Sequence, residues 1–369
     1  MQAIDPTATT LPGRDYTSQE VFDLERERIF HRGWYFVGRS DPIAAGDRLV
    51  VDVAGESVLV VRDRDGALHA HANVCRHRGA RLCEQSGPGA KGSITCPYHA
   101  WSYALDGRLI ATPNVSADEL DRGALSLWSI AVDEWEGFAF VSLAPSPPPL
   151  LDWLSDQDDP PMRFAKYGLG ALRVGWRTVS DVAANWKILI DNYLECLHCP
   201  RVHPELVDIV PTYRSGDVID ARRRDGGVDL VPGSTSFSLT GRSALPLLPA
   251  MPEQDAGSYF GATVFPNMFI DVTGTCVVVT TLHPRGPAHT TVVGEYLFAP
   301  ETIAAPDFEP SDVVDFNELV ARQDYEVCEM VQRGVGSRSF AGGALSSKDR
   351  LVADMKRRYL IERGPLQDS

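Results

Sequence analysis

Four potential metal ligands in an unusual mixed order constrain the fold of this chain more than any other feature. Cys75 and His77 form a C-x-H pair, and Cys96 and His99 form a C-x-x-H pair after 18 intervening residues. A two-iron, two-sulfide cluster in which two imidazoles replace two thiolates needs this ligand set. Each pair would lie on a tight loop that supplies one thiolate and one imidazole. The sequence therefore predicts a small domain whose two loops hold a [2Fe-2S] cluster.

Zinc is the ordinary alternative for these four residues, because it accepts the same ligand types. Zinc fingers usually pair Cys with Cys and His with His along the chain, whereas each pair here is mixed. Cys83 lies between the two pairs and matches no ligand position, so we expect it to be a small buried residue. The mixed order favours the cluster over zinc.

Charge and composition exclude several other classes. A formal net charge of -15 and a pI near 5.0 argue against a nucleic-acid partner, because phosphate binding draws on clustered Lys and Arg. No apolar run approaches the roughly 20 residues that cross a bilayer, and the N-terminus lacks the pattern of a signal peptide. Seven cysteines without such a signal fit a reducing compartment better than a disulfide framework. We expect a cytoplasmic protein that binds no membrane.

The first half of the chain contains a helix, a β-rich region and a linker. Residues 17–32 are predicted to form the helix, since Thr17 and Glu20 match a capping box and apolar pairs recur behind them. Short β-rich runs separated by Asp-Gly turns predict a small antiparallel β domain over 34–143. The proline-rich acidic stretch APSPPPLLDWLSDQDDPP reads as a linker and predicts a domain boundary near residue 150.

The second half is predicted to be α+β, with strands and helices segregated along the sequence. Helical patterns cover 181–199, 311–334 and 347–361, and the strand-like runs TCVVVTTLH and TTVVGEYLF lie between them. The stretch 227–256 is rich in Gly, Pro and Ser and is predicted to be a long loop.

A second group of potential ligands lies in NWKILIDNYLECLHCPRVHPEL, which contains Asp191, Glu195, His198 and His203. Non-haem iron enzymes that activate dioxygen bind the metal through two His and one carboxylate and leave positions open. Residues five apart on an ideal helix diverge by about 140°, so Pro200 is predicted to break the helix between the histidines. Glu195 and His198 would share one helix face. The ordinary alternative is an exposed helix that carries His and Glu.

With the GWYFVG strand, the segment C-P-Y-H-A-W, the NWK sequence and E-x-x-H-x-x-x-x-H, the chain resembles the catalytic α subunits of Rieske non-haem iron oxygenases over nearly its whole length. The resemblance implies an α+β protein with an antiparallel β Rieske domain at 34–150. It implies a helix-grip, START-like catalytic domain at 151–369, with a curved antiparallel sheet and helices. An N-terminal helix within 1–33 would pack on the catalytic domain, and the family implies a homotrimer.

The resemblance also implies a mononuclear Fe(II) on His198, His203 and an Asp of a late helix. The matching stretch is RQDYEV, which makes Asp324 the predicted third ligand. Glu326 or Glu329 would compete if the register differs, and an exposed helix carboxylate is the ordinary alternative.

In related enzymes a carboxylate bridges a cluster histidine of one subunit to an iron-bound histidine of its neighbour. By position, this relay would run from His99 through Glu195 to His198, with Asp191 supporting the same helix network. Many family members have Asp at the bridging position, whereas this chain has Glu. Glu at this place is similar to carnitine, choline and betaine oxygenases.

The resemblance therefore implies a terminal oxygenase that uses dioxygen to hydroxylate or oxidatively N-demethylate a small organic substrate, with a quaternary ammonium or N-methylated compound favoured. NAD(P)H-derived electrons would come from a separate flavin reductase, with or without a ferredoxin, since the chain has no G-x-G-x-x-G fingerprint. The second hypothesis is an aromatic-ring-hydroxylating dioxygenase. The third is a Rieske electron carrier or ligand-binding protein whose second site is inert.

Aromatic residues that follow His203 are candidates for contact with the substrate, because ring faces attract a quaternary ammonium through cation–π interactions. The alternative for each of them is ordinary core packing. The candidates are Phe237, Tyr259, Phe260, Phe265 and Phe269.

Overall fold

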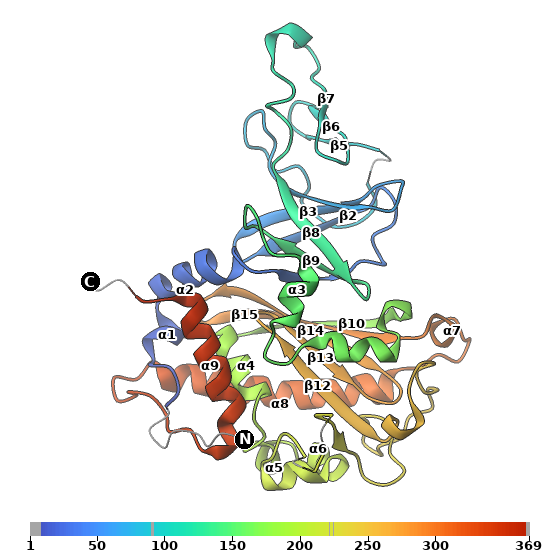
Figure 1. Cartoon of the computed structure of the whole chain (residues 1–369), viewed down its shortest axis with the longest axis vertical. Coiled ribbons are helices and arrows are strands. Elements are labelled where there is room, and N and C mark those ends of the chain that lie inside the picture. Colours follow the sequence, from blue (N-terminus) through green and yellow to red (C-terminus); the bar gives the residue numbers. More distant parts are fainter. Residues whose placement is uncertain (1–8, 90–91, 221, 224, 367–369) are drawn as a thin grey trace. The chain divides into compact units, whose positions relative to one another are not determined.

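The computed structural model describes residues 9–89, 92–220, 222, 223 and 225–366, and the chain divides into two compact units (Figure 1). The β unit is Phe30–Trp153, and the second unit, called the catalytic unit after the domain that the resemblance predicts, combines Met1–Ile29 with Leu154–Ser369. The first unit consists mainly of strands, and the second combines a sheet with helices. The predicted α+β fold is confirmed.

The β unit contains two antiparallel sheets. The larger sheet has the order β1-β9-β8-β4-β3-β2, and the smaller one has the order β5-β6-β7. Its turns include the predicted Asp-Gly pairs, where Gly66 and Gly107 have φ angles of 90° and 89° that favour glycine. The strands are β1 (Tyr35–Arg39), β2 (Arg48–Val53), β3 (Glu56–Arg62), β4 (Leu68–Ala72), β5 (Ile94–Thr95), β6 (Ser102–Tyr103), β7 (Leu109–Ala111), β8 (Ser129–Trp135) and β9 (Phe138–Ser142).

The catalytic unit is built on one antiparallel sheet with the order β10-β15-β14-β13-β12-β11. Residues along β12 alternate strictly between buried and half-buried, as expected when the two faces of a strand have different surroundings. The strands are β10 (Arg173–Val182), β11 (Val228–Asp229), β12 (Ser258–Val264), β13 (Met268–Val272), β14 (Val277–Gly286) and β15 (His289–Phe298).

The long helix α8 (Ser311–Val335) packs against α4 (Trp186–Tyr193) and β10, and it runs alongside the sheet in Figure 1. Within the described residues, no helix combines the length and the apolar character needed to cross a bilayer. The other helices are α3 (Leu150–Ser155), α5 (Cys199–Val202), α6 (Pro204–Ile209), α7 (Pro300–Ile303) and α9 (Arg350–Arg363).

Two predicted segments differ from the structure. The helical pattern at 181–199 begins on the last residues of β10, because pairing with β15 extends that strand to Val182. The helix itself is limited to α4. The predicted linker after Ala144 contains the short helix α3.

The N-terminal segment forms α1 (Arg14–Thr17), α2 (Gln19–Glu25) and a π-helical turn (Arg26–Phe30) rather than one helix over 17–32. The break falls at Ser18, whose extended backbone starts α2 and whose hydroxyl accepts a hydrogen bond from the backbone N–H of Val21. Ser18 therefore caps the helix in place of the predicted Thr17.

A buried ion pair joins this segment to α4 within the catalytic unit. Lys187 Nζ lies 2.5 Å from Glu25 Oε1, and both side chains are fully buried. Trp186 Nε1 and the hydroxyl of Tyr359 also donate hydrogen bonds to Glu25, at 2.8 and 2.7 Å. Removal of one partner of such a buried ion pair would strongly destabilise the fold, because the remaining charge would stay buried without compensation. The NWK sequence thus anchors the N-terminal helices.

Candidate metal centres

The two mixed Cys/His pairs of the β unit lie on two loops with the same backbone geometry. Cys75 and Cys96 each accept a hydrogen bond from the N–H four residues later, at 3.0 and 3.1 Å. Each also donates its own N–H to the carbonyl five residues later, at 2.8 Å in both loops. The fourth residue after each cysteine, Gly79 or Ala100, has a left-handed φ of 75° or 56°. Two matching turns therefore present the two pairs.

The side chains of the two loops converge. Cys75 and Cys96 are buried, and the rings of His77 and His99 lie 4.7 Å apart. The Nδ1 atom of His77 is buried and has no hydrogen-bond partner in the described part of the chain. A buried lone pair without a partner is costly unless a metal accepts it. Because the side chains converge and this nitrogen lacks a partner, the four residues fit the ligand set of a Rieske cluster.

An apolar cluster lies beneath the loops. Cys83 belongs to it and is buried, with Arg48 Nη1 3.1 Å from its sulfur. The prediction that Cys83 is a small buried residue is confirmed. The cluster also includes Leu59, Val61, Cys75, Leu82, Ile94, Cys96, Trp101 and Tyr103.

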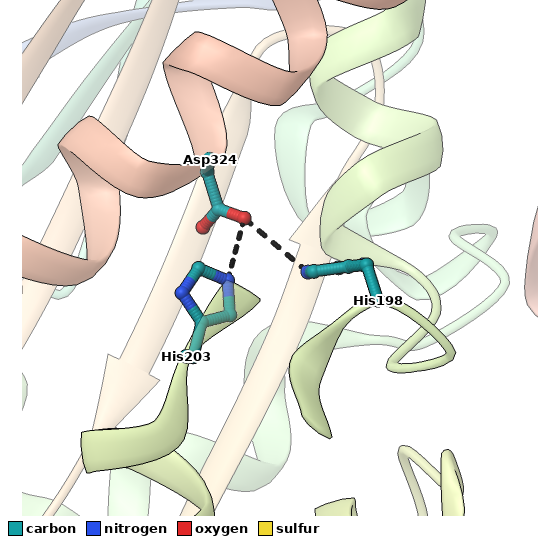
Figure 2. Close-up of side chains that lie close together, drawn as sticks. All are labelled: His198, His203 and Asp324. Atoms are coloured by element: carbon teal, nitrogen blue, oxygen red, sulfur yellow. Dashed lines mark hydrogen bonds and ion pairs between the residues drawn. The ribbon is translucent and has the colours of Figure 1, made fainter. Parts of the chain in front are cut away.

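The second group of ligands meets in the catalytic unit (Figure 2). His203 Nε2 lies 2.8 Å from Asp324 Oδ1, and His198 Nε2 lies 3.3 Å from the same oxygen. The ligand atoms of all three residues lie within 4.8 Å of one another. Two imidazoles and one carboxylate in this arrangement form the 2-His-1-carboxylate triad of non-haem iron enzymes. The donor set fits Fe(II).

The competing carboxylates of α8 do not join the triad. Glu326 is exposed, and Glu329 accepts a hydrogen bond from the backbone N–H of Ala183 at 3.0 Å. Asp324 is the carboxylate of this stretch that faces the two histidines (Figure 2).

The helix is interrupted around His198, although not at Pro200, where the interruption was predicted. Helix α4 ends at Tyr193, so Glu195 and His198 lie in the turn between helices rather than on a helix face. Pro200 lies in the first turn of α5, where the missing N–H costs nothing. His203 then separates α5 from α6 with a φ of -123° and a ψ of 64°. Two short helices, rather than one broken helix, orient the histidines.

The outer ring nitrogens are held by acceptors that point the inner nitrogens at one place. His198 Nδ1 donates to Glu195 Oε1 at 2.6 Å, and His203 Nδ1 donates to Gln323 Oε1 at 2.8 Å. Gln323 in turn donates from Nε2 to Glu205 at 3.3 Å. Such partners fix the ring orientation and the tautomer of metal-binding histidines. Gln323 was not predicted, and its only sequence signal is its position beside Asp324.

The electrostatics of the triad favour a bound cation. Burial lowers the pKa of His198, but hydrogen bonds to Asp324 and Glu195 outweigh it and raise the pKa to about 9. Burial raises the pKa of Asp324, yet the hydrogen bonds to His198 and His203 leave it below its usual value. The site therefore stabilises positive charge at the inner nitrogens, where a divalent metal would replace the proton.

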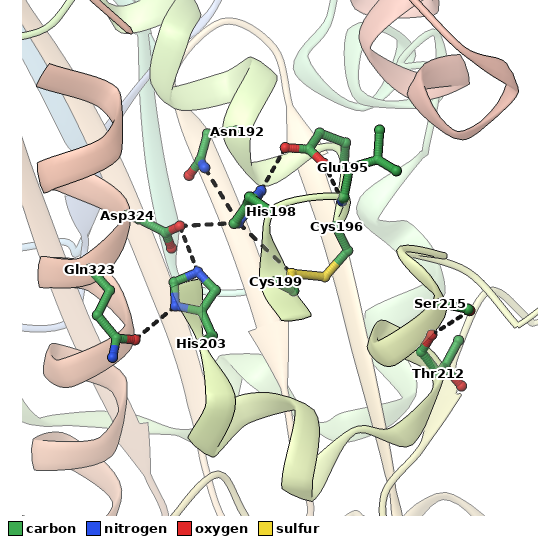
Figure 3. Close-up of a disulfide and its surroundings, with 11 residues drawn as sticks. Asn192, Glu195, Cys196, His198, Cys199, His203, Thr212, Ser215, Gln323 and Asp324 are labelled. Carbon is green, nitrogen blue, oxygen red and sulfur yellow. Dashed lines mark hydrogen bonds and ion pairs between the residues drawn. A yellow bond between two sulfur atoms is a disulfide. The ribbon is translucent and has the colours of Figure 1, made fainter. Parts of the chain in front are cut away.

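Cys196 and Cys199 form a disulfide on either side of His198 (Figure 3). Their Cα atoms are 5.0 Å apart, and Cys199 Sγ lies 3.8 Å from His198 Nε2. The sequence favoured a reducing compartment over a disulfide framework, and this one pair departs from that expectation, while the other five cysteines are free. The spacing C-x-x-C was the available signal, because a turn of this length brings two cysteines within bonding distance.

Asp191 lies on α4 and accepts a hydrogen bond from the hydroxyl of Tyr16 at 3.1 Å. Burial raises its pKa to about 7, with the hydrogen bond from Tyr16 acting against that rise. It ties α4 to the N-terminal segment and is not among the described residues that line the cavity beside the triad.

A cavity of about 610 Å³ adjoins the triad, and His198, His203 and Asp324 all line it. One wall is formed mainly by a single face of the sheet, because cavity-lining residues occur at every second position along β13, β14 and β15. The lining positions are Tyr259, Gly261, Ala262 and Thr263 on β12, Phe269 and Asp271 on β13, Val278, Thr280 and Leu282 on β14, and Val292, Gly294 and Tyr296 on β15.

Four of the five predicted aromatic residues line this cavity, namely Phe237, Tyr259, Phe265 and Phe269. Phe260 is the exception, because it follows Tyr259 on β12 and points to the opposite face of the sheet. It is buried there, with its ring 5.8 Å from that of Tyr167. The structure places Phe260 in the core rather than in the cavity wall.

Two protein-family models match this chain. The model described as Ring hydroxylating alpha subunit (catalytic domain) matches residues 169–360. The model described as Rieske [2Fe-2S] domain matches residues 33–132. The first match contains the triad, and the second contains both Cys/His loops.

Relatives match along nearly the whole chain. The glycine betaine monooxygenase oxygenase subunit of Chromohalobacter salexigens is 33% identical over 368 residues, which cover 91% of this chain and 82% of that protein. The carnitine monooxygenase oxygenase subunit of Escherichia coli K12 is 29% identical, with 97% of this chain and 91% of that protein covered. The crystal structure of a quaternary ammonium Rieske monooxygenase with its substrate γ-butyrobetaine superposes with a TM-score of 0.77 at 25% identity, covering 99% and 100% of the two chains.

The chain belongs to the α subunits of the Rieske non-haem iron oxygenases. It is the catalytic subunit of such an enzyme, related to the carnitine, glycine betaine and choline monooxygenases. The predicted family and enzyme class are confirmed, and an oxygenase subunit of this kind implies a reductase partner.

Proposed function

We propose that this subunit is a monooxygenase that hydroxylates or oxidatively N-demethylates a small quaternary ammonium or other N-methylated compound. The observation that carries the proposal is a cavity that joins the triad to aromatic walls. Tyr193 and Phe269 stack with ring centroids 4.1 Å apart, and Phe237 and Tyr259 lie 4.9 Å apart. Ring faces attract a quaternary ammonium, which has no N–H to donate.

His198, His203 and Asp324 would hold Fe(II), and Cys75, His77, Cys96 and His99 would hold the [2Fe-2S] cluster. When bound, the iron supplies dioxygen activation and the cluster supplies single electrons. The residues of the chain orient the ligands, position the substrate and exclude water. The outer partners of the histidines would hold the imidazoles that face the cavity in place, and the cavity walls would place the N-methyl group and exclude water.

Glu195 is proposed to couple the two centres in a homotrimer. One carboxylate oxygen accepts from His198 Nδ1 at 2.6 Å, and the other accepts from the backbone N–H of Leu197. A carboxylate fixed in this way would also accept from His99 of the partner subunit and pass a change in protonation between the two histidines. Electrons would come from NAD(P)H through the separate reductase.

A substrate screen tests the proposal. Purified protein with both metal centres, NADH and a generic Rieske reductase is incubated with N-methylated, alicyclic and aromatic compounds, and formaldehyde and hydroxylated products are measured. Formaldehyde or a hydroxylated product should appear with N-methylated compounds. Asp324→Ala should abolish it, while Glu326→Ala, an exposed change on the same helix, should not. Formation of cis-diols from aromatic compounds alone would instead establish a ring-hydroxylating dioxygenase.

A further inference from the structure

One wall of the cavity contains a carboxylate, Asp271, that is not part of the metal-binding triad. Asp271 lies on β13 and faces the cavity beside Phe269. The hydroxyls of Tyr193 and Tyr259 both donate to its Oδ1 atom, at 2.7 and 2.6 Å. Directly across the sheet is Gly261, where a Cβ atom would collide with both tyrosine hydroxyls. The wall is therefore shaped around this carboxylate and its two donors.

Asp271 has no cationic partner in the part of the chain that the structure describes. No Lys, Arg or His forms an ion pair with it, and its Oδ2 atom accepts no hydrogen bond from the described residues. Burial raises its pKa to about 6, although the two tyrosine hydrogen bonds lower it. The group is mostly ionised at neutral pH. A half-buried carboxylate that lines a cavity without a compensating charge is costly, and a cationic ligand would remove that cost.

The surroundings of Asp271 select the type of cation. Both tyrosine hydroxyls already donate their protons to the carboxylate. The side chains that line the cavity next to Asp271 include the aromatic rings of Tyr193, Tyr259 and Phe269. Tyr193 stacks on Phe269, and Tyr259 lies against Phe237. A primary ammonium would require several hydrogen-bond acceptors, whereas a permethylated ammonium needs only net negative charge and ring faces.

We infer that Asp271, oriented by Tyr193 and Tyr259, is the counter-ion for the quaternary ammonium group of the substrate and makes the cavity selective for cations. The inference rests on the proposed function and sharpens it, since it assigns substrate selection to one side chain. The alternative is that Asp271 only links strands β12 and β13 to helix α4 through its hydrogen bonds to the two tyrosines. In that case its charge would be irrelevant to what the cavity binds.

Binding of a minimal probe separates these alternatives. Tetramethylammonium chloride is titrated by calorimetry into iron-loaded, cluster-containing protein. Asp271→Asn keeps the shape of the side chain and removes the charge, so binding should weaken about tenfold or more. Asp255→Asn is the matched control, because this buried carboxylate also accepts a hydrogen bond from a tyrosine, Tyr167 at 3.1 Å, but is paired with Lys166 at 2.7 Å and is not among the described residues that line the cavity. The control should bind the probe as the unaltered protein does.

A neutral isostere tests whether charge is what matters. Choline and 3,3-dimethylbutanol have the same shape and differ in the charged nitrogen. The unaltered protein should prefer choline, and Asp271→Asn should lose most of that preference while its affinity for the neutral alcohol stays the same or rises. Equal choline preference in both proteins would overturn the inference.

Tyr259→Phe provides a second variant in case Asp271→Asn does not fold. It keeps the ring and removes one of the two hydrogen bonds that favour the ionised carboxylate. Cation binding should weaken several-fold, and unchanged binding would count against the inference.

Turnover distinguishes this inference from the proposed function. If N-methylated compounds are oxidised and Asp271→Asn leaves KM for them unchanged, the inference fails and the function stands. If no such compound is oxidised but tetramethylammonium binding depends on Asp271, the cation subsite stands and the proposed reaction fails.

Discussion

The two metal-binding regions of this protein are built in different ways. In the β unit, two loops with matching backbone hydrogen bonds and left-handed turns present one Cys and one His each. In the catalytic unit, His203 and Asp324 are 121 residues apart in sequence, and side-chain partners such as Glu195 and Gln323 fix the imidazoles. The first region depends on backbone geometry, and the second depends on a network of side chains. Single substitutions should therefore affect the two regions differently.

Loss of one triad ligand should have the largest effect on turnover. His203→Ala should remove the mononuclear iron and reduce oxygenation on the order of a thousandfold, because an incomplete ligand set cannot hold the metal in its open geometry. The visible spectrum of the cluster should remain. Iron analysis together with absorbance measures both, and loss of the cluster in this variant would contradict the separation of the two regions.

Loss of one cluster ligand should have the reverse pattern. His77→Ala should abolish the visible cluster chromophore and reductase-dependent turnover while leaving iron in the triad. His69→Ala, which removes another histidine of the β unit that is paired with Asp63 at 2.8 Å, should leave the chromophore intact. Retention of iron, sulfide and chromophore in His77→Ala would exclude the proposed ligand set.

Glu195→Gln should affect coupling rather than either metal. The amide keeps the shape of the side chain but cannot accept protons as a carboxylate does, so product formation per oxidised cluster should fall about 10–100-fold. Stopped-flow absorbance of the cluster and product analysis in one turnover provide the measurement. Unchanged single-turnover transfer would rule out the relay, and Glu326→Gln serves as the control on α8.

Gln323→Leu should weaken the triad without removing a ligand. His203 would lose the acceptor of its Nδ1 proton, and iron affinity should fall about 10–100-fold. Competition with a chelator measures this directly. Arg322→Leu is the neighbouring exposed control, and equal iron affinity in the two variants would show that Gln323 does not orient the ring.

The smallest effect is expected from the disulfide. Replacing Cys196 and Cys199 by Ser opens a very short loop, and chain-entropy arguments limit the loss to about 2 kcal/mol of unfolding free energy. The loop around His198 should loosen, so iron should dissociate somewhat faster while the cluster is unaffected. A larger loss of cluster than of iron would contradict the assignment of this bond to the triad region.

The same contrast explains what the sequence could predict. Ligands that are two or three residues apart on a turn can be recognised from spacing, and the antiparallel β unit follows from alternation and Asp-Gly turns. Helix α8 was predicted almost to its ends because its apolar pattern extends over the whole helix. The triad needed the family resemblance, since no local pattern indicates that Asp324 meets His203.

The errors have physical causes. Pairing with β15 keeps residues up to Val182 in a strand, which overrides the helical pattern there. Pro200 begins a helix instead of ending one, because both positions tolerate proline. Phe260 was grouped with Tyr259 although neighbours on a strand face opposite sides. Gln323 acts through a contact between distant segments that no spacing reveals.

A single turnover tests the central claim most directly. Protein with both centres reduced is exposed to isotopically labelled dioxygen and a quaternary ammonium substrate, without reductase, and cluster oxidation and product are quantified. The account predicts that the cluster oxidises as product forms and that one labelled oxygen atom enters the hydroxylated product. Cluster oxidation without any product, or a product that contains two labelled atoms, would contradict it.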